Sequence, residues 1–577
     1  MRPRLNPEAR AVHRAILGEI RKRLILPGSE SYLGLFSLTN DIDEILKRQD
    51  YLKEGLSRVR PEMKGLISRV KPVKFRREFL GDRVLLVDES EVERAEAMNL
   101  CHVTTDPEEA REYPIVLSTT GYGIEVELRP QDVAPELYVI PLWENRETLE
   151  ALAELGRITG RESVAGEILN ALKEFESVNA REQLLENLDE MIAEKERWLN
   201  ERISEKLENF SLTLSGKELL NFLAQLREGN YEAIFSHFTG IEEEIIELVN
   251  EAERELSDAL GFTVELFQRD ELYPVHVPPE RVEELRQFLE RELALERYLK
   301  AREVVERIGH LIPELKKELE KIHELDFLLA VKEFTENFSF PEVWDGGIAF
   351  IRGRHLFIEN PQPVSYVVGR KPQEFAVPGS ENVGDENVVI LTGANSGGKT
   401  SLLELITQVE ILFHMGFPVP AERAWVEPLD ELFFFRRKRS VYGAGAFETA
   451  LKSFVRALRG KGRKLILIDE FEAITEPGAA VKIIGELLKV AQERGFKVVI
   501  VSHLGGELKE TLPFARVDGI EARGLDENLN LIVDRQPVFG RLGRSTPELI
   551  VERLARKARG KDREIYERIL ASFGRNV

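Results

Sequence analysis

The sequence predicts a multidomain protein of mixed α and α/β class, in which a mainly helical region precedes a C-terminal domain with a mostly parallel sheet. At 577 residues the chain is too long for one hydrophobic core, so roughly three to five domains are expected. Between residues 147 and 334, apolar side chains recur at helical spacing among Glu, Lys and Arg. From residue 345 to 535, apolar runs alternate with amphipathic stretches, as in parallel sheets covered by helices.

The N-terminal part of the chain changes character at about residue 70. Residues 1–70 predict helices, with breaks at Pro27-Gly28 and near Asn40. Residues 71–146 predict a small α/β module, because short apolar runs are punctuated by Gly and Pro. The expected strands of this module are residues 84–87, 114–117, 124–128 and 137–140.

Residues 147–344 are expected to form long helices that run out to a distal tip, at about residues 211–277, and back. Residues 262–267 are expected to form a strand at that tip. A plain helical bundle explains the same periodicity equally well. Residues 345–540 form the predicted sheet domain, and residues 541–577 predict a short, basic, helical tail. The plainest strands of the sheet domain are residues 388–391, 465–468 and 498–501.

The composition excludes several classes of protein. No apolar run approaches the roughly 20 residues of a membrane span, and the N-terminus lacks the apolar core of a signal peptide. The single cysteine, Cys101, excludes an internal disulfide and a cysteine-built zinc site. These features predict a cytoplasmic protein with no membrane partner. The net charge of -22 argues against indiscriminate coating of nucleic acid but allows a local basic surface.

A phosphate-binding loop is predicted at the end of the first plain strand of the sheet domain. The residues that match the pattern G-x-x-x-x-G-K-[ST], together with the next residue of the following helix, are Gly393, Ala394, Asn395, Ser396, Gly397, Gly398, Lys399, Thr400 and Ser401. Glycines let backbone N–H groups wrap phosphates, and the helix N-terminus adds partial positive charge. Lys399 is predicted to contact the β- and γ-phosphates of ATP, and Thr400 to ligate Mg²⁺.

Two later strands end in polar residues. Asp469 and Glu470 follow one strand; Asp469 is predicted to ligate Mg²⁺, and Glu470 to orient or deprotonate the attacking water. His503 follows the other strand and is predicted to sense the γ-phosphate. Each alone fits an ordinary strand end. In this order after the loop, they predict an ATPase that uses ATP and Mg²⁺, with Lys399, Glu470 and His503 as its catalytic residues.

A segment rich in small residues lies between the loop and the acidic strand. Gly445 and Phe447 belong to residues 440–448, in which small residues precede an aromatic one. Such a segment suits close approach to the nucleotide of another subunit, and these two residues are predicted to contact it. A glycine hinge in an ordinary loop is an equally good explanation.

The order of these motifs resembles that of the MutS family of DNA mismatch-repair ATPases. Asn395 stands in the loop where that family has asparagine, and Arg354-His355 resembles the family's Arg-His-Pro element, with Leu356 in place of the proline. Residues 322–327 resemble the lever helix that precedes this element. Further likenesses, to the opening of the family's core domain and to its tail, lie at residues 23–27, 42–48 and 542–548.

The resemblance implies a homodimer of ABC-type ATPases. Residues 147–344 would be a lever and clamp that enclose DNA, and ATP hydrolysis would open and close them. Residues 541–577 would take part in dimerisation. The resemblance also implies that Tyr366 stacks on adenine and that Thr475 matches the threonine of the segment after the acidic pair.

Three features depart from the family pattern. The mismatch-reading domain is not visible, so the likeness is to the shorter branches: the archaeal short type, and the second bacterial type without its C-terminal nuclease domain. Gly445-Ala446 stand where the family has Ser-Thr, so the serine that would meet the γ-phosphate across the dimer is missing. The glycines that follow the acidic pair in the family are missing from residues 471–474.

Any nucleic-acid surface on this acidic chain must be local. Three basic clusters are candidates for phosphate contact, although most such clusters are solvated faces. They are Lys71, Lys74, Arg76 and Arg77; residues 436–439; and Arg553, Arg556, Lys557, Arg559, Lys561 and Arg563. No interleaving of aromatic and basic residues predicts base readout, so recognition of DNA shape is expected.

The sequence therefore predicts an ATP-dependent, homodimeric DNA-binding clamp that acts on branched or recombining DNA rather than on mismatches. The alternative is a quality-control ATPase that uses the same clamp on the ribosome or RNA. A structural-maintenance-type ATPase is disfavoured because both nucleotide motifs follow the helical region. A nuclease is disfavoured because the sequence suggests no metal cluster outside the ATPase motifs.

Overall fold

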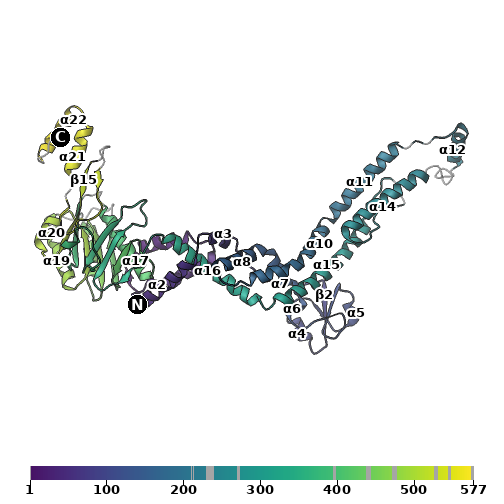
Figure 1. Ribbon diagram of the computed structural model, residues 1–577, viewed down its shortest axis with the longest axis horizontal. Coiled ribbons are helices and arrows are strands. Elements are labelled where there is room, and N and C mark those ends of the chain that lie inside the picture. The colour runs from purple at the N-terminus through teal and green to yellow at the C-terminus, as the bar shows by residue number, and fades with distance from the viewer. Residues whose placement is uncertain are drawn as a thin grey trace. The chain divides into compact units, whose positions relative to one another are not determined.

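The chain forms two compact units in this computed structural model. Unit 1 consists of Met1–Ser68 and Glu320–Val577, and unit 2 is the continuous segment Arg69–Leu319. Figure 1 shows the helices and strands of both units. The residues that the structure describes are 2–209, 211, 213–228, 239–269, 273–393, 398–436, 444–470, 477–525, 531–543 and 547–572.

A six-stranded parallel sheet forms the centre of unit 1 (Figure 1). In their order across the sheet, the strands are β1 (Arg4–Leu5), β11 (Glu431–Phe435), β12 (Lys464–Asp469), β13 (Lys497–Val501), β9 (Val388–Gly393) and β14 (Arg516–Ile520). The predicted strands at 388–391, 465–468 and 498–501 are confirmed as parts of β9, β12 and β13. Their apolar residues are buried on both faces, as in parallel sheets generally.

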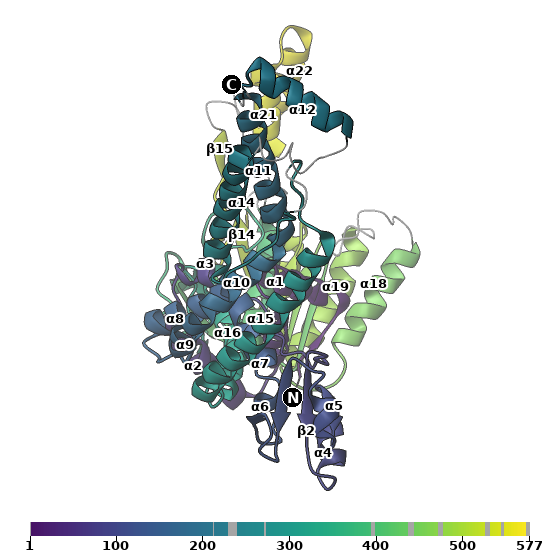
Figure 2. The ribbon, with the colours of Figure 1, turned by 90° about the vertical axis from the view of Figure 1, so that its right-hand side faces the viewer.

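Helices cover both faces of this sheet. α17 (Lys399–Met415) packs on one face and is itself covered by α1 (Pro7–Arg21) and α2 (Ile42–Arg58). α18 (Ala444–Ala457) and α19 (Pro477–Glu493) share a hydrophobic core with the other face (Figure 2). Because α17 lies between the sheet and two helices, nearly all its side chains are buried, which explains why it is apolar on all sides.

The first residues of the chain complete the edge of the sheet, which was not predicted. β1 pairs with β11, with Arg4 opposite Glu431. The Asn6 side chain continues this pairing, since its amide nitrogen donates to the Phe434 carbonyl at 2.8 Å and its amide oxygen accepts from the Phe434 N–H at 3.1 Å. The same oxygen accepts from the Ala9 N–H and caps α1. A strand of 2 residues is too short for its pattern to be recognised.

A smaller mixed sheet and a helical tail belong to the same unit. The strands of this sheet, in order, are β6 (Glu342–Val343), β10 (Arg423–Val426), β7 (Gly347–Gly353) and β8 (Val364–Gly369). The other elements are α3 (Met63–Ile67), α20 (Gly505–Thr511), the hairpin β15 (Ala522–Leu525) and β16 (Leu531–Val533), α21 (Pro547–Lys557), α22 (Lys561–Ser572), and the 3₁₀ segments Pro27–Phe36 and Ser380–Asn382.

α16 (Ile312–Phe334) is held in unit 1 by its C-terminal half, and the division between the two units falls inside this helix. Asp326 is fully buried and accepts hydrogen bonds from the backbone N–H groups of Ile25, at 3.0 Å, and Leu26, at 2.8 Å. Beside it, Phe327 stacks on Phe36. The Leu-Asp pattern of this helix therefore fixes α16 to the segment that follows α1.

The N-terminal part of unit 2 folds as a parallel sheet with short helices. Its elements are, in sheet order, β3 (His102–Thr104), β2 (Arg83–Leu86), β4 (Ile115–Ser118) and β5 (Ile124–Glu125), with α4 (Val92–Glu96), α5 (Pro107–Ala110) and α6 (Pro130–Val133). Strands predicted at 84–87 and 114–117 are confirmed, and of the strand predicted at 124–128 only Ile124–Glu125 forms one. The core of this part also takes in Tyr298, whose hydroxyl donates to the Asp132 carbonyl at 2.9 Å.

The fourth predicted strand, residues 137–140, is wrong. These residues lie in α7 (Glu136–Glu144), where Val139 and Leu142 are buried on one side of the helix. A short apolar run cannot by itself be told from a buried helical turn. Pro135 at the start of α7 was the available signal, because a proline there costs the helix no hydrogen bond.

Long helices make up the rest of unit 2, and α11, α14 and α15 share one hydrophobic core. The bounds are α8 (Arg146–Thr159), α9 (Ala165–Leu172), the 3₁₀ segment Lys173–Phe175, α10 (Glu176–Glu186), α11 (Leu188–Asn209), α12 (Gly216–Glu228), α14 (Thr239–Leu260) and α15 (Pro279–Ile308). None of the helices in the described ranges of the chain is long and apolar enough to cross a membrane.

The strand expected at residues 262–267 is also wrong, since this segment is neither strand nor helix. Its backbone donors are satisfied by side chains of α14 instead of by a neighbouring strand. The Glu253 carboxylate accepts from the N–H groups of Leu266 and Phe267, at 2.9 and 3.1 Å, and the Ser257 hydroxyl accepts from Val264 N–H at 2.9 Å. The segment thus packs as a loop on the helices.

Candidate active site

The predicted site residues come from three neighbouring strands of the large sheet. β9 lies next to β13, and β13 next to β12, with Leu391 level with Val501 and Val501 level with Asp469. The carboxyl ends of these strands therefore stand side by side at one edge of the sheet. This edge is where parallel α/β sheets generally bind ligands.

The start of the predicted phosphate loop is a close approach between two strands. Gly393 has φ +119°, and a Cβ atom at this position would lie 2.1 Å from the Ile520 carbonyl oxygen, so only glycine fits. Gly398, with φ +84°, closes the loop at the N-terminus of α17. The four residues between them, Ala394, Asn395, Ser396 and Gly397, lie outside the described residues.

Lys399 and Thr400 form the first turn of α17, and Ser401 follows them. Lys399 is only 3% exposed, and its ammonium group donates to the Gly393 carbonyl at 2.7 Å. This contact holds the ammonium group across the base of the loop. A lysine placed there can meet phosphate oxygens that the loop encloses.

Asp469 and Thr400 meet at the end of β12. The Thr400 hydroxyl donates to Asp469 Oδ2 at 2.9 Å. Asp469 Oδ1 is buried and accepts no hydrogen bond from the part of the chain that the structure describes. Burial raises the pKa of this carboxyl, and the neighbouring charge of Glu470 raises it further, against the opposing effect of the Thr400 hydrogen bond. A hydroxyl and a buried carboxylate oxygen with no donor are a fitting partial ligand set for Mg²⁺, which prefers oxygen.

Glu470 and His503 stand next to each other beyond the same edge. His503 Nε2 lies 3.2 Å from Glu470 Oε1. Glu470 has φ +48°, which is uncommon for a residue with a side chain. Its backbone N–H donates to the Val501 carbonyl at 3.2 Å, so the turn that carries this carboxylate is tied to β13. An acid and a histidine in contact can orient a water molecule and move a proton.

Behind the loop, His355 ties the Arg354-His355 element to α17. Its Nε2 lies 2.8 Å from a Glu404 oxygen, and its Nδ1 accepts from the Phe357 N–H at 3.2 Å. Burial, and then the charge of Arg436, lower the pKa of His355 to about 4. His355 is therefore neutral, with its proton on Nε2 toward Glu404.

Two arginines near this site were not assigned to it from the sequence. Arg436 follows β11 and forms an ion pair with Glu404 of α17; it was expected to contact nucleic acid together with residues 437–439, which lie outside the described residues. Arg535 lies beside the loop, since a Cβ atom at Gly398 would be 3.5 Å from its Cδ. No local pattern marks Arg535, because it lies in the segment after β16, far along the chain from Gly398.

Other predicted contacts do not come together in the same way. Tyr366 is fully buried and stacks on Phe539, with ring centroids 6.0 Å apart, so its expected stacking on adenine does not fit this structure. Gly445 and Phe447 belong to the first turn of α18, and their side-chain surroundings are outside the description. Residues 440–443 and Thr475 are outside it as well.

Comparison with known proteins supplies the family. No protein-family model matches the chain. It is 59% identical over 570 residues to a "DNA-binding protein MutS2" of Pyrococcus furiosus, covering 99% of this chain and 100% of that protein. It is 28% identical over 225 residues to an "Endonuclease MutS2" of Clostridium botulinum, covering 37% of this chain and 26% of that one. For the "Endonuclease MutS2" of Clostridium acetobutylicum the identity is 29% over 238 residues, covering 39% and 28%. This chain therefore belongs to the MutS family.

Proposed function

We propose that this protein is an ATP-dependent DNA-binding clamp, a cytoplasmic homodimer that acts on branched or recombining DNA rather than on mismatches. The observation that carries the ATPase part is the pairing of Thr400 with Asp469, whose second oxygen is buried without a donor, beside Lys399 at the start of α17. The DNA-binding part is supported by the printed name of the Pyrococcus furiosus relative.

In this proposal each site residue has one role. Lys399 holds phosphate charge, and Thr400 and Asp469 supply oxygen ligands for Mg²⁺. Glu470 orients the attacking water and takes its proton, with His503 placed to report on the γ-phosphate. When bound, Mg²⁺ supplies the charge that neutralises the phosphate oxygens. We add Arg535 and Arg436 as neighbouring cations that favour a bound anion.

The proposal of a homodimer is supported by the helical tail. α21 and α22 pack on each other but leave four aliphatic side chains exposed. They are Ile550, Leu554, Ile565 and Ile569. Exposed apolar residues gathered on a short helical hairpin are typical of an association surface. A second copy of the same hairpin is the occupant that we propose, and Gly445 and Phe447 would then lie near the partner's nucleotide.

The coupling of hydrolysis to the clamp is proposed to run through α16. Asp326 and Phe327 fix the C-terminal half of this helix within unit 1. The N-terminal residues of the same helix belong to unit 2, because the division falls inside it. A displacement of this helix after nucleotide exchange would therefore be felt by residues of unit 2.

A competition among DNA and RNA substrates tests the proposal. A fluorescent four-way junction is bound to the full-length protein, with and without ATP, and is challenged with plain duplex, mismatched duplex and ribosomes. We expect junctions to compete best, mismatched and perfect duplexes to compete equally, and binding to weaken with added salt. ATP hydrolysis stimulated by ribosomes but not by junctions would replace DNA with the ribosome as the partner. A strong preference for the mismatch would contradict the proposed substrate class.

A further inference from the structure

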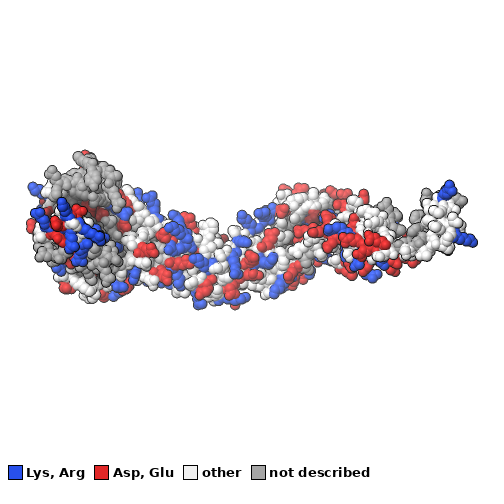
Figure 3. Space-filling model, turned by 90° about the horizontal axis from the view of Figure 1, so that it is seen from above, with Lys and Arg blue, Asp and Glu red and all other residues white. Residues whose placement is uncertain are grey.

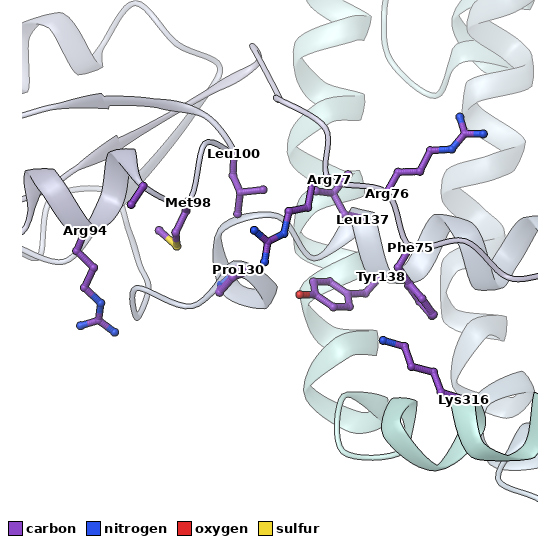
Figure 4. A pocket seen from close by; sticks show the side chains of 11 residues that line it. Phe75, Arg76, Arg77, Arg94, Met98, Leu100, Pro130, Leu137, Tyr138 and Lys316 are labelled. Carbon is purple, nitrogen blue, oxygen red and sulfur yellow. The ribbon is translucent and has the colours of Figure 1, made fainter. Parts of the chain in front are cut away.

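A pocket of about 420 Å³ lies in unit 2, between the parallel-sheet part and the helices that pack beside it (Figure 4). Such a volume is within the range of small-molecule sites, roughly 300 to 1,000 Å³. The residues that matter most for its chemistry are Phe75, Arg77, Arg94, Leu137, Tyr138 and Lys316. They come from four stretches of the chain that are far apart in sequence, so no local motif marks the pocket.

The charge of this pocket is entirely positive. Its charged lining residues are Arg76, Arg77, Arg94 and Lys316, with no Asp or Glu among them. Within the described ranges, none of the four cations forms an ion pair with a carboxylate. On a chain with a net charge of -22, cations gathered without acidic partners favour a ligand of opposite charge.

Three polar groups converge on the opening. In Figure 4, the side chains of Arg77, Tyr138 and Lys316 point toward one another, whereas Arg76 points away. The Tyr138 hydroxyl makes no hydrogen bond with any described residue. A guanidinium, an ammonium and a hydroxyl that face one space are suitable donors for the oxygens of a phosphate group.

The floor of the pocket is apolar and aromatic, which a site for a bare anion would not need. Met98, Leu100 and Leu137 line it, and the ring of Phe75 lies next to Tyr138, with centroids 6.3 Å apart. The Lys316 ammonium lies 5.0 Å from the Phe75 ring centre. A ring system placed over this floor would stack on the aromatic side chains, while its phosphate met the cations.

The surface of α14, in the same unit, repels phosphate. Of the 22 residues of α14, eight are Asp or Glu and one, Arg254, is basic. Figure 3 shows acidic side chains gathered over this stretch of the long helices. Contact with a nucleic-acid backbone is therefore expected at a local basic site and not along α14.

We propose that this pocket binds one unpaired nucleotide of a single DNA strand, with its base on the apolar floor and its phosphate at Arg77 and Lys316. Branched DNA carries such unpaired nucleotides where its arms meet or end in single strands. The inference rests on the DNA-binding part of the proposed function but not on ATP hydrolysis. It also supplies the base contact that the sequence did not predict, because the basic and aromatic residues are interleaved only in space.

The test measures binding of a fluorescein-labelled oligothymidylate to the full-length protein without ATP. Arg77→Ala and Lys316→Ala are each expected to weaken binding about tenfold and to reduce its salt dependence by about one phosphate contact. Tyr138→Ala is expected to weaken binding about fivefold or more, because both the stacking ring and the hydroxyl donor are lost, and Tyr138→Phe to weaken it less, because only the hydroxyl donor is lost. Arg76→Ala is the matched control, since it removes the same charge from the adjacent position but points away.

Competing ligands then show whether the site recognises a DNA strand, a free nucleotide or phosphate alone. Thymidine monophosphate should displace the oligonucleotide better than thymidine or inorganic phosphate, and a duplex of equal length should displace it poorly. If Arg76→Ala and Arg77→Ala weaken oligonucleotide binding equally, the general positive charge and not the pocket explains the binding, and the inference is wrong. If thymidine monophosphate binds as tightly as the oligonucleotide, the site serves a free nucleotide and the strand assignment is wrong. If the unaltered protein binds no DNA of any form, the proposed function fails; if it binds but all pocket variants bind equally well, only this inference fails.

Discussion

Asp469 illustrates how a functional residue can cost stability. Its Oδ1 atom is buried without a donor, and burial raises the pKa of the carboxyl, so the ionised form is disfavoured until a cation arrives. The same position in a purely structural protein would be filled by a neutral or apolar group. An energetically unfavourable arrangement of this kind is typical of binding sites.

Replacement of Asp469 by asparagine should therefore separate stability from metal binding. Without nucleotide and Mg²⁺, Asp469→Asn is expected to raise the free energy of unfolding by about 1 kcal/mol, because the buried charge is removed. Mg²⁺-dependent nucleotide binding should be lost. Thermal unfolding and nucleotide titration, with and without Mg²⁺, measure the two effects. An Asp469→Asn protein that is less stable and still binds nucleotide through Mg²⁺ would contradict the assigned role.

His414 predicts loss of stability in acid. Its Nδ1–H donates to the Thr39 carbonyl at 2.7 Å, and its Nε2 accepts from the Leu429 N–H at 3.2 Å, an arrangement that requires the neutral ring. Glu410 lies 3.8 Å from Nε2, and burial raises the pKa of its carboxyl well above the ordinary value. Burial lowers the pKa of His414 from 6.5 to about 4. Below pH 6.5 the His414 imidazole therefore binds a proton in the unfolded chain but stays neutral in the folded chain until the pH approaches 4.

The contribution of His414 to the free energy of unfolding is accordingly expected to be constant above pH 6.5 and to fall as the pH drops from 6.5 to about 4, by on the order of 3 kcal/mol. Urea unfolding at a series of pH values measures the slope. His414→Gln keeps one donor and one acceptor but does not titrate, so it should flatten the curve. His13 and His355, whose pKa values burial also lowers to about 4, add slope of the same sign, whereas Glu410, whose pKa burial raises, adds slope of the opposite sign.

The residues of the nucleotide site differ in how far the sequence reveals them. Lys399, Thr400, Asp469, Glu470 and His503 each follow a strand of the same parallel sheet, and parallel strands bring their carboxyl ends to one edge. Their meeting was therefore predictable. The position of Arg535 was not predictable, because it lies in a segment after β16 whose place depends on tertiary packing. Tyr366 was misassigned because family likeness alone does not reveal whether a ring faces the core.

At the level of elements, strands made of uninterrupted apolar runs were predicted, whereas β7 and β8, which carry glycine or polar residues among the apolar ones, were not. β9, β12 and β13 are runs of Val, Ile and Leu that only a buried strand explains. Residues 137–140 and 262–267 have a similar composition but other structures, since Pro135 starts a helix in one case and Glu253 caps backbone donors in the other. Those causes lie in neighbours that the local pattern does not include.

Glu253 gives a prediction for the loop at 262–267. Glu253→Ala would leave the N–H groups of Leu266 and Phe267 buried without acceptors, at a cost of about 2 to 4 kcal/mol. Hydrogen exchange of these two amides should increase, and the helices of the same core should unfold earlier on heating. Glu251→Ala, on the exposed face of α14, is the control and should leave both unchanged. Protected amides at Leu266 and Phe267 in Glu253→Ala would show that other groups hold the loop.

For the whole molecule, association through the tail is the feature most open to direct test. Leu554→Lys combined with Ile565→Lys should convert the proposed dimer to a monomer, because both side chains are exposed on the tail hairpin. ATP turnover should fall with it if a second subunit completes the site. Sedimentation and steady-state ATPase measurements test both. Leu220→Lys, at an exposed leucine on α12, should change neither property, and an unchanged mass for the tail variant would place the dimer contact elsewhere.

The pairing of β1 with β11 has a consequence for how the nascent chain matures. Asn6 and Phe434 are joined by hydrogen bonds but are 428 residues apart in sequence. β1 therefore stays unpaired until most of the chain has been translated. Unit 2 is one continuous segment that lies between these two, and it can fold while the ribosome is still making unit 1. Until β1 docks, β11 is an open strand edge, a known route to aggregation. A tag fused directly to Arg4 would hinder this docking and lengthen that exposed interval.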